Sequence, residues 1–445
     1  MVGLVVACLN LLSPPAKAAD TLLWRTAEAT VDADLASADL VPVLERISEA
    51  TGWAVYLEPG TKRAVTVKFK GRSPDRALDL MLGDLGRVLL PGTNGGPHRL
   101  LVFRSGQQEA TQQIQRRAAK PKPIPNELIV TAKAGTDLDA LAKKLGAKVV
   151  GKSKGLNSAR LRFEDESAAN TAGKALESNE DVLSTDPNFA VTERPVPEDL
   201  AGAPRTGPAI RPVQQGDPVV VALIDTHVGS LGPQYDGFML DRISVATTPA
   251  QPTEALEHGS AMFGTAMNAM KGVNQGSNVR FLSVDVYGGS EQTTTYELTE
   301  GLYQATQKKA TIISMSLGAD GDSPYLGRYI EDLTKAGYVV VASAGNKPVT
   351  TPTFPAAYNG VLAVTAGVAP GELAPYANRG SFVDIMAPGT SFVNYNGMPW
   401  RVTGTSPAAA FVSGFIADNM DRFKMSAKDA VAAAMTAFPP IKVGN

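Results

Sequence analysis

Four side chains that acyl-transfer chemistry requires are spread along the second half of this 445-residue chain. Asp225 ends the apolar run VVVALID, His258 opens HGSAMFG, Asn346 closes VVASAGN, and Ser406 begins SPAAAFVSG. A nucleophilic serine needs a base to take its proton, a carboxylate to orient that base, and hydrogen-bond donors for the developing oxyanion. The four residues supply one of each.

Each of these residues alone also has a purely structural explanation. A serine followed by proline and small apolar residues is typical of a helix start, so Ser406 alone could be a helix cap. A lone histidine such as His258 is more often structural than catalytic. The joint occurrence favours catalysis, because all four residues fall at expected strand ends or helix starts.

The elements that must position these residues begin near Val219. From there, apolar strands alternate with helix-like stretches, a pattern that predicts a parallel sheet between two layers of helices. The expected strands are VVVALID, VRFLSVDV, TIISMSL, YVVVASAG and GVLAVTA. In such sheets the reactive groups gather at the carboxyl ends of the strands, where Asp225 and Asn346 fall.

Residues 219 to about 437 resemble the subtilisin-like serine proteases, the subtilase family. The matching motifs are ALIDTHV, HGSAMFG, ISMSLG, VVASAGN and GTSPAAAFVSG, in the chain order Asp, His, Ser. The resemblance implies an α/β, parallel-sheet, three-layer fold and a serine endopeptidase of the EC 3.4.21 class. It makes Ser406 the nucleophile, His258 the base and then the acid, and Asp225 the residue that orients His258. Asn346 would donate its amide to the oxyanion.

The same resemblance implies where a peptide or protein substrate lies. It would pair as an added strand along Ser316, Leu317 and Gly318, with Ser343, Ala344 and Gly345 opposite. His227 stands where this family usually has glycine; we expect its side chain to face solvent, and the alternative is that it perturbs the electrostatic field of the site. No metal ligand is predicted in the site and no cofactor is required for catalysis, whereas structural calcium is left open.

Two small α+β units precede the protease-like region. In residues 20–105, expected helices begin at Asp39 and at Ser73-Pro74 and alternate with strands such as VTVKF. This pattern resembles the short N-terminal domain of secretins and TonB-type receptors, which implies an envelope protein as docking partner. The alternative is an independent small domain with no docking role.

The second unit, residues 124–192, follows a polar linker at 106–123 and has β-α-β-β-α-β signals. Beside a subtilase region it resembles the inhibitor-like propeptide of that family, which implies that the chain's own propeptide binds the cleft. The alternative is a plain ferredoxin-like spacer. A proline-rich connector at 193–218 leads into the protease domain at 219–445, and we expect self-cleavage between about 192 and 218.

Composition limits the partners and the location. With 19% charged residues and a net charge of -2, the chain has no basic stripe for nucleic acid. Residues 1–19 read as a signal sequence whose apolar run is too short to span a bilayer, although Cys8 could belong to a lipoprotein signal. The sequence thus predicts a secreted or periplasmic endopeptidase with no transmembrane segment in the mature chain. The alternative is a catalytically idle, protease-like binding or docking protein.

Overall fold

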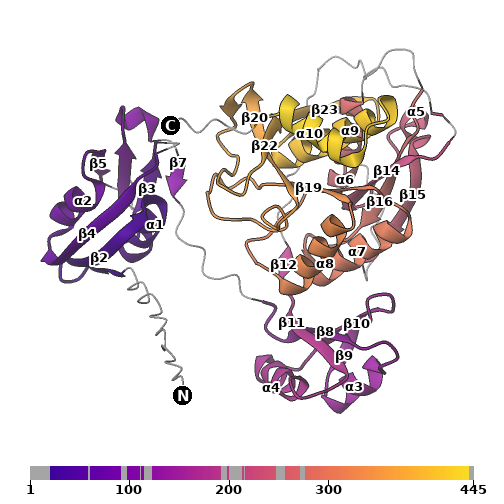
Figure 1. Ribbon diagram of the computed structural model, residues 1–445, viewed down its shortest axis with the longest axis horizontal. Helices are drawn as coiled ribbons and strands as arrows, with labels where there is room; N and C mark the ends of the chain where they lie inside the picture. The colour runs from indigo at the N-terminus through magenta and orange to yellow at the C-terminus, as the bar shows by residue number, and fades with distance from the viewer. Residues whose placement is uncertain are drawn as a thin grey trace, which may run out of the picture. The chain divides into compact units, whose positions relative to one another are not determined.

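The computed structural model describes residues 21–58, 61–91, 98–110, 112–114, 123–191, 198–199, 213–214, 216–246, 256–270 and 276–439. The predicted signal sequence at 1–19 lies outside these residues, as do part of the predicted linker and most of the connector. The chain divides into two units, with the boundary after Arg117 (Figure 1). No helix in the described ranges is long and apolar enough to cross a membrane.

The first unit packs two helices against two small sheets around one apolar core. The sheet orders are β1-β2-β4 and β5-β6-β3-β7. Helix α1 follows Asp39 as the sequence predicts, although the Asp39 side chain makes no capping hydrogen bond. The elements are β1 (Thr21–Arg25), β2 (Thr30–Asp39), α1 (Leu40–Thr51), β3 (Ala54–Leu57), β4 (Ala64–Arg72), α2 (Pro74–Leu82), β5 (Gly86–Leu90), β6 (Arg99–Phe103), η1 (Gln107–Glu109) and β7 (Gln112–Ile114).

This first unit extends beyond the predicted boundary at residue 105. Strand β7 pairs antiparallel with β3, with Ile114 opposite Val55, and Ile114 is buried in the core. The sequence of β7, QQI, is too short and polar to predict a strand. The strand forms because the edge of β3 offers it unpaired backbone groups.

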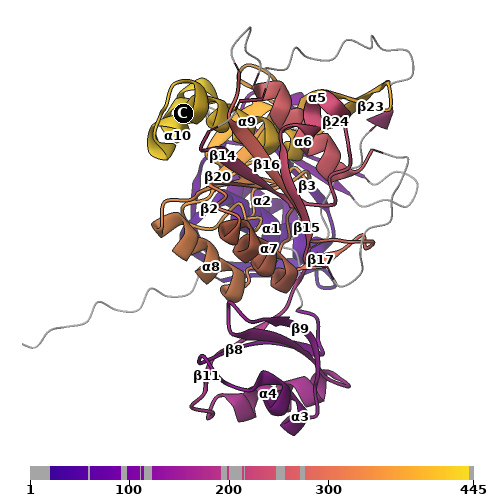
Figure 2. The ribbon, with the colours of Figure 1, turned by 90° about the vertical axis from the view of Figure 1, so that its right-hand side faces the viewer.

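The second unit begins with a four-stranded antiparallel sheet and two helices, in the β-α-β-β-α-β order predicted from the sequence (Figure 2). The sheet order is β11-β8-β10-β9. Asp137 caps one helix by accepting from the Ala140 N–H at 3.0 Å, and Asp165 caps the other through the Ala168 N–H at 2.8 Å. The elements are β8 (Glu127–Ala132), α3 (Leu138–Lys144), β9 (Lys148–Ser153), β10 (Ser158–Arg162), α4 (Glu166–Leu176) and β11 (Val182–Pro187).

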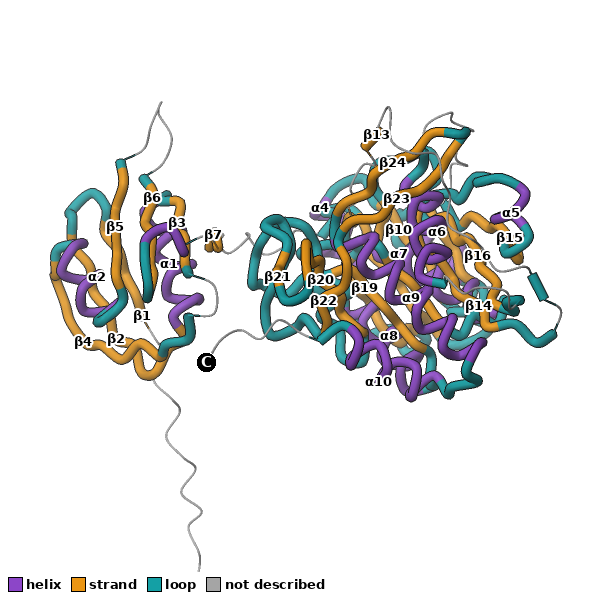
Figure 3. The backbone as a smooth tube through the Cα atoms, turned by 90° about the horizontal axis from the view of Figure 1, so that it is seen from above, coloured by secondary structure: helices purple, strands orange, loops and turns teal. Residues whose placement is uncertain are grey.

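Two short strands follow before the large sheet. Strand β12 (Ala190–Val191) pairs antiparallel with β17 (Thr293–Thr294), and β13 (Glu198–Asp199) pairs antiparallel with β24 (Met398–Thr403). Figure 3 shows β13 beside β24, which forms a hairpin with β23 (Thr390–Tyr395).

The rest of the unit is built on an eight-stranded sheet, which confirms the predicted α/β fold. Its order is β15-β16-β14-β18-β19-β20-β21, with β22 also beside β20, and only β21 runs antiparallel to its neighbour. The sheet strands are β14 (Val219–Asp225), β15 (Met239–Ser244), β16 (Val279–Asp285), β18 (Ile312–Met315), β19 (Val339–Ser343), β20 (Leu362–Ala369), β21 (Glu372–Leu373) and β22 (Ile385–Pro388).

Helices cover both faces of this sheet. Val221 and Leu223 of β14 belong to one core cluster, with residues of α6, α9 and α10, whereas Val220 and Ala222 belong to a second cluster with α7 and α8. Alternate residues of a strand point to opposite faces, so an uninterrupted apolar strand needs a core on each side. The helices are α5 (Pro233–Asp236), α6 (His258–Ala269), α7 (Thr295–Gln307), α8 (Pro324–Lys335), α9 (Thr405–Arg422) and α10 (Ala427–Ala437).

Candidate active site

Asp225 and His258 form a buried pair at the carboxyl end of β14. Asp225 is the last residue of the strand and His258 the first residue of α6, and both side chains are almost fully buried. The His258 Nδ1 lies 2.8 Å from Asp225 Oδ1 and 3.0 Å from Oδ2. The carboxylate therefore holds the Nδ1–H tautomer and leaves Nε2 as the basic nitrogen.

The start of α6 is held by the loop that follows Asp225. The Gly259 N–H donates to Thr226 Oγ1 at 2.8 Å, and the Gly229 N–H donates to Ser260 Oγ at 2.8 Å. A Cβ at position 259 would lie 2.2 Å from the Thr226 carbonyl oxygen, so only glycine fits after the histidine. The motif HGS thus fixes where the imidazole stands.

Ser406 lies at the same edge of the sheet, next to the end of β18. Strands β14 and β18 are parallel neighbours with Ile224 opposite Met315, so Asp225 and Ser316 come next in register. Ser406, the second residue of α9, donates its hydroxyl to the Ser316 carbonyl at 3.1 Å, and Ser316 Oγ donates to the Ser406 carbonyl at 3.1 Å. The structure thus places the serine and the Asp225–His258 pair at one edge.

The helix-cap interpretation of Ser406 does not describe this structure. The N-cap of α9 is Gly404, and no side chain caps that helix. Ser406 is 2% exposed, and its hydroxyl contacts the Ser316 carbonyl, one residue after β18, instead of its own helix. The buried His258 Nε2 has no hydrogen-bond partner among the described residues, so the serine hydroxyl is not bonded to it in this state. Such bonds are often long without substrate.

Asn346 is oriented through its side-chain oxygen. This oxygen accepts from the Thr405 N–H at 2.9 Å and from Thr405 Oγ1 at 3.1 Å, and Thr405 Oγ1 also accepts from the Gly345 N–H at 3.0 Å. Among the described residues, nothing accepts a hydrogen bond from the Asn346 amide nitrogen. Thr405, the residue before Ser406, therefore holds the Asn346 oxygen and leaves the amide nitrogen free to donate.

Sequence reasoning missed Asn378, which holds the loop around Asn346. Its amide nitrogen donates to the Ala344 carbonyl at 2.7 Å and to Thr353 Oγ1 at 2.9 Å, and its oxygen accepts from the Lys347 N–H at 2.8 Å. Asn378 is 1% exposed. It bonds mainly to backbone in a distant loop, so no local motif marks it; only its buried polar side chain could.

The two predicted substrate segments leave the sheet side by side. Strands β18 and β19 are parallel neighbours with Met315 opposite Ala342, and the segments at 316–318 and 343–345 follow them. All six predicted residues are buried, and among them Ser316 is hydrogen bonded to Ser406. His227 is half-buried, and its ring has no hydrogen bond within the described ranges.

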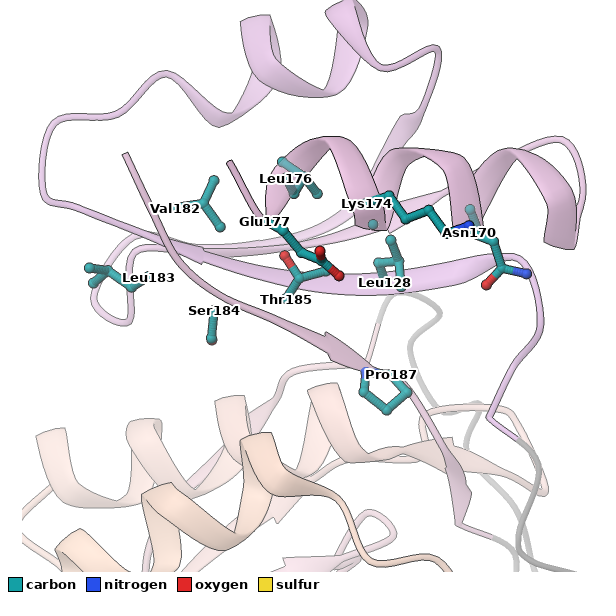
Figure 4. A pocket seen from close by; sticks show the side chains of 12 residues that line it. Leu128, Asn170, Lys174, Leu176, Glu177, Val182, Leu183, Ser184, Thr185 and Pro187 are labelled. Atoms are coloured by element: carbon teal, nitrogen blue, oxygen red, sulfur yellow. The ribbon is translucent and has the colours of Figure 1, made fainter. Parts of the chain in front are cut away.

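Two further features of the second unit lie outside this cluster. A groove of about 600 Å³ separates α4 from β11, and every residue that lines it belongs to residues 128–187 (Figure 4). It therefore adds nothing to the Asp225–His258–Ser406 site. In the described ranges, no three His, Cys, Asp or Glu side chains are grouped to hold a metal ion.

Comparison with known proteins identifies both parts of the second unit. Residues 216–437 match the subtilase family, and residues 109–188 match the N-terminal prodomain of fervidolysin. The fervidolysin structure from Fervidobacterium pennivorans, a keratinolytic enzyme related to subtilisin, superposes with a TM-score of 0.55 at 18% identity, covering 70% of this chain and 56% of that one. The structure of an epidermin leader peptide processing serine protease from Staphylococcus aureus superposes with a TM-score of 0.52 at 18% identity. The match covers 69% of this chain and 91% of that one.

Curated sequences give the same family. The chain is 31% identical over 218 residues to the major intracellular serine protease of Bacillus subtilis, covering 46% of this chain and 68% of that protein. It is 30% identical over 203 residues to a thermophilic serine proteinase of Bacillus sp. AK1, but spans only 51% of that protein and 44% of its own length. The chain belongs to the subtilase family of serine proteases.

Proposed function

We propose that the chain is a secreted or periplasmic endopeptidase that hydrolyses peptide bonds through an acyl-enzyme on Ser406. The observation that carries this proposal is the buried Asp225–His258 contact, which leaves Nε2 without a partner at the same sheet edge as the serine. The base would take the hydroxyl proton as Oγ attacks the substrate carbonyl, and would return it to the leaving amine. Asn346 would stabilise the oxyanion.

Covalent labelling tests the nucleophile. A fluorophosphonate probe should attach to processed wild-type protein at Ser406 and should fail to label Ser406→Ala. Ser413→Ala is a matched control, because Ser413 lies on the same helix and bonds Ser314 Oγ at 2.9 Å, away from the site. Folded, processed wild type that stays unlabelled would instead favour the idle binding protein.

We also propose that the chain cuts itself between the two short paired strands. Val191 pairs with Thr293 on one side, Glu198 pairs with Arg401 on the other, and β24 leads through Gly404 to Ser406. The chain between these pairings, 192–197, lies outside the described residues. Both described ends of this segment pair with the catalytic part of the same chain, and a reaction within one chain has a high effective molarity.

Maturation of purified protein tests this second proposal. Wild type should yield a fragment whose first residue lies between 193 and 198, at a rate independent of protein concentration. Ser406→Ala should remain one chain. Normal cleavage of purified Ser406→Ala, with no other protease present, would exclude self-processing.

The location and the role of residues 20–105 rest on the sequence. The Bacillus subtilis relative is called intracellular, so export is inferred only from the apolar run at residues 2–12. We propose that the first unit docks an envelope protein, supported by its resemblance to secretin-type domains and by its own separate core. Deleting residues 21–114 should then abolish retention in the envelope while peptide hydrolysis persists; retention of the deleted form would overturn the docking role.

A further inference from the structure

A buried charge cluster joins the prodomain to the catalytic part of the second unit. Glu127 of β8, Arg160 of β10 and Glu297 of α7 are each less than 10% exposed. Arg160 donates from Nε to Glu127 Oε2 at 2.7 Å and from Nη2 to Glu127 Oε1 at 3.1 Å, and its Nη1 bonds Glu297 Oε1. One guanidinium thus bridges a prodomain carboxylate and a catalytic-domain carboxylate.

Glu127 is already paired without the catalytic domain. It also accepts from Arg162 Nε at 2.8 Å and from Asn188 Nδ2 at 2.8 Å, all within the prodomain. Burial raises the pKa of Glu127, but the hydrogen bonds from Arg160 and Asn188 outweigh burial and bring the pKa below its ordinary value. The Arg160 Nη1 donor is therefore left for a carboxylate outside the prodomain.

Glu297 connects this donor to the strand that receives the prodomain's end. Its Oε2 accepts a hydrogen bond from the hydroxyl of Thr294, the last residue of β17. Thr294 pairs with Ala190 of β12, and Phe189 accepts from the Thr295 N–H at 3.0 Å. The two oxygens of one carboxylate therefore contact the prodomain sheet and β17.

The shapes of the two surfaces fit around this cluster. A Cβ at Gly151 would lie 2.6 Å from the Tyr296 ring, and a Cβ at Gly155 would lie 2.0 Å from the Tyr303 hydroxyl, so glycines let the prodomain hairpin reach α7. Tyr296 stacks on Tyr325 at an interplanar angle of 6°, and both rings cluster with Ile129 of the prodomain. Glu297 can bond Arg160 only when these surfaces meet.

We propose that Glu297 is the specificity-determining residue by which the catalytic domain recognises its own prodomain, through the Arg160 guanidinium. The proposal rests on the self-processing function above and adds its regulation. After the cut, the prodomain is held without a covalent bond, and the buried Arg160–Glu297 pair sets how long it stays. A prodomain lacking this arginine would leave Glu297 buried and unpaired.

The test compares two glutamates on one helix. Glu297→Gln keeps the shape but removes the charge. Glu300→Gln is the matched control: it removes a charge beside Gly151 of the same prodomain surface, but Glu300 accepts its hydrogen bond from Gln304 Nε2, at 2.8 Å within α7. Each full-length chain is allowed to process itself, and the release of the cleaved prodomain is followed by size-exclusion chromatography and by the onset of peptide hydrolysis.

Release should be about tenfold faster in Glu297→Gln, because a hydrogen bond to a charged group is stronger than a neutral one. In Glu297→Ala it should be faster by on the order of a hundredfold. Glu300→Gln should match wild type, and after release kcat and KM should be unchanged in Glu297→Gln. A purely structural role for Glu297 would alter those constants.

Equal release rates in Glu297→Gln and Glu300→Gln would overturn the proposal. Should Glu297→Gln not fold, Arg160→Lys tests the pair from the prodomain side, because lysine keeps the charge but cannot bond two carboxylates with a planar guanidinium. Release at the wild-type rate in Arg160→Lys would also overturn the proposal. Failure of the underlying function looks different, because wild type itself would then remain uncut and unlabelled.

Discussion

The two polar atoms of the Asn346 side chain, the amide oxygen and the amide nitrogen, have different roles. Thr405 occupies the oxygen, so the nitrogen is available only to a group that enters the site. A donor held in place before the reaction acts most strongly where negative charge develops, in the transition state.

We therefore expect Asn346→Ala to lower kcat by about 10² to 10³ and to leave KM nearly unchanged. Asn268→Ala serves as the control. Asn268 lies on α6, and its amide nitrogen donates to the Phe392 carbonyl at 2.9 Å, not to a residue of the site. Steady-state kinetics on a peptide substrate measures both constants. A rise in KM equal to the loss in kcat/KM would show that Asn346 binds the ground state instead.

At this scale the sequence predicts residues that stand next to strong local signals. Asp225 ends a buried strand, and Ser406 and His258 begin helices, so their positions follow from the pattern of the elements. Asn378 and Glu297 carry no such signal, because their partners lie far along the chain. Long-range hydrogen bonds of this kind depend on tertiary packing, which local patterns do not encode.

At the scale of elements, α6 and α9 carry His258 and Ser406 in their first turns and pack directly on each other (Figure 3). A Cβ at Gly414 of α9 would lie 2.1 Å from the Ala266 carbonyl oxygen of α6. The two backbones thus touch without an intervening side chain.

Gly414→Ala should therefore push the helices apart, lower the free energy of unfolding by about 1 to 3 kcal/mol, and reduce kcat. Gly173→Ala, in helix α4, is the contrasting variant. A Cβ at this position would meet only Leu128 Cδ1, at a distance of 3.8 Å. That change should stabilise the chain by about 0.5 to 1 kcal/mol. Urea unfolding measures both; an unaltered midpoint for Gly414→Ala would contradict the packing argument.

The sequence predicts the central strands of the large sheet well and its margins poorly. Buried strands such as β14 and β19 are apolar throughout, whereas β15, MLDRIS, mixes charged and apolar residues and was not predicted. The β23–β24 hairpin, which forms a separate sheet with β13, was also missed, although its Asn396-Gly397 turn, with φ of 50° and 74°, is a known hairpin signal. Edge strands are partly solvated, so their patterns are weaker.

At the scale of the whole molecule, the prodomain meets the catalytic domain through Arg160, which Glu127 holds in place from the prodomain side. Glu127 has a pKa below its ordinary value of 4.5, and the groups that face it are Arg160, Arg162 and Asn188, with Glu297 beyond Arg160. A lowered pKa stabilises the folded form above the ordinary value, and this contribution is lost as the pH falls through the lowered pKa.

We therefore expect Glu127 to contribute a constant amount to the free energy of unfolding of the uncut Ser406→Ala chain above pH 4.5. Below pH 4.5 this contribution should decrease as the pH falls. Glu127→Gln in the same background should be less stable at neutral pH and should show a flatter acid dependence. Thermal unfolding between neutral and acidic pH measures both chains. Parallel curves for the two would exclude Glu127 as the titrating group.

The contact between Gly414 and Ala266 also bears on how this enzyme could be modified. The backbone contact at Gly414 limits how closely α6, which begins with His258, and α9, which carries Ser406, can approach each other. We expect core side chains that lie elsewhere on these helices, such as Met262 and Ile416, to tolerate exchange for others of similar volume, because such swaps disturb packing little. Engineering for thermal stability should therefore keep two glycines unchanged, Gly259 beside the Thr226 carbonyl and Gly414 beside the Ala266 carbonyl.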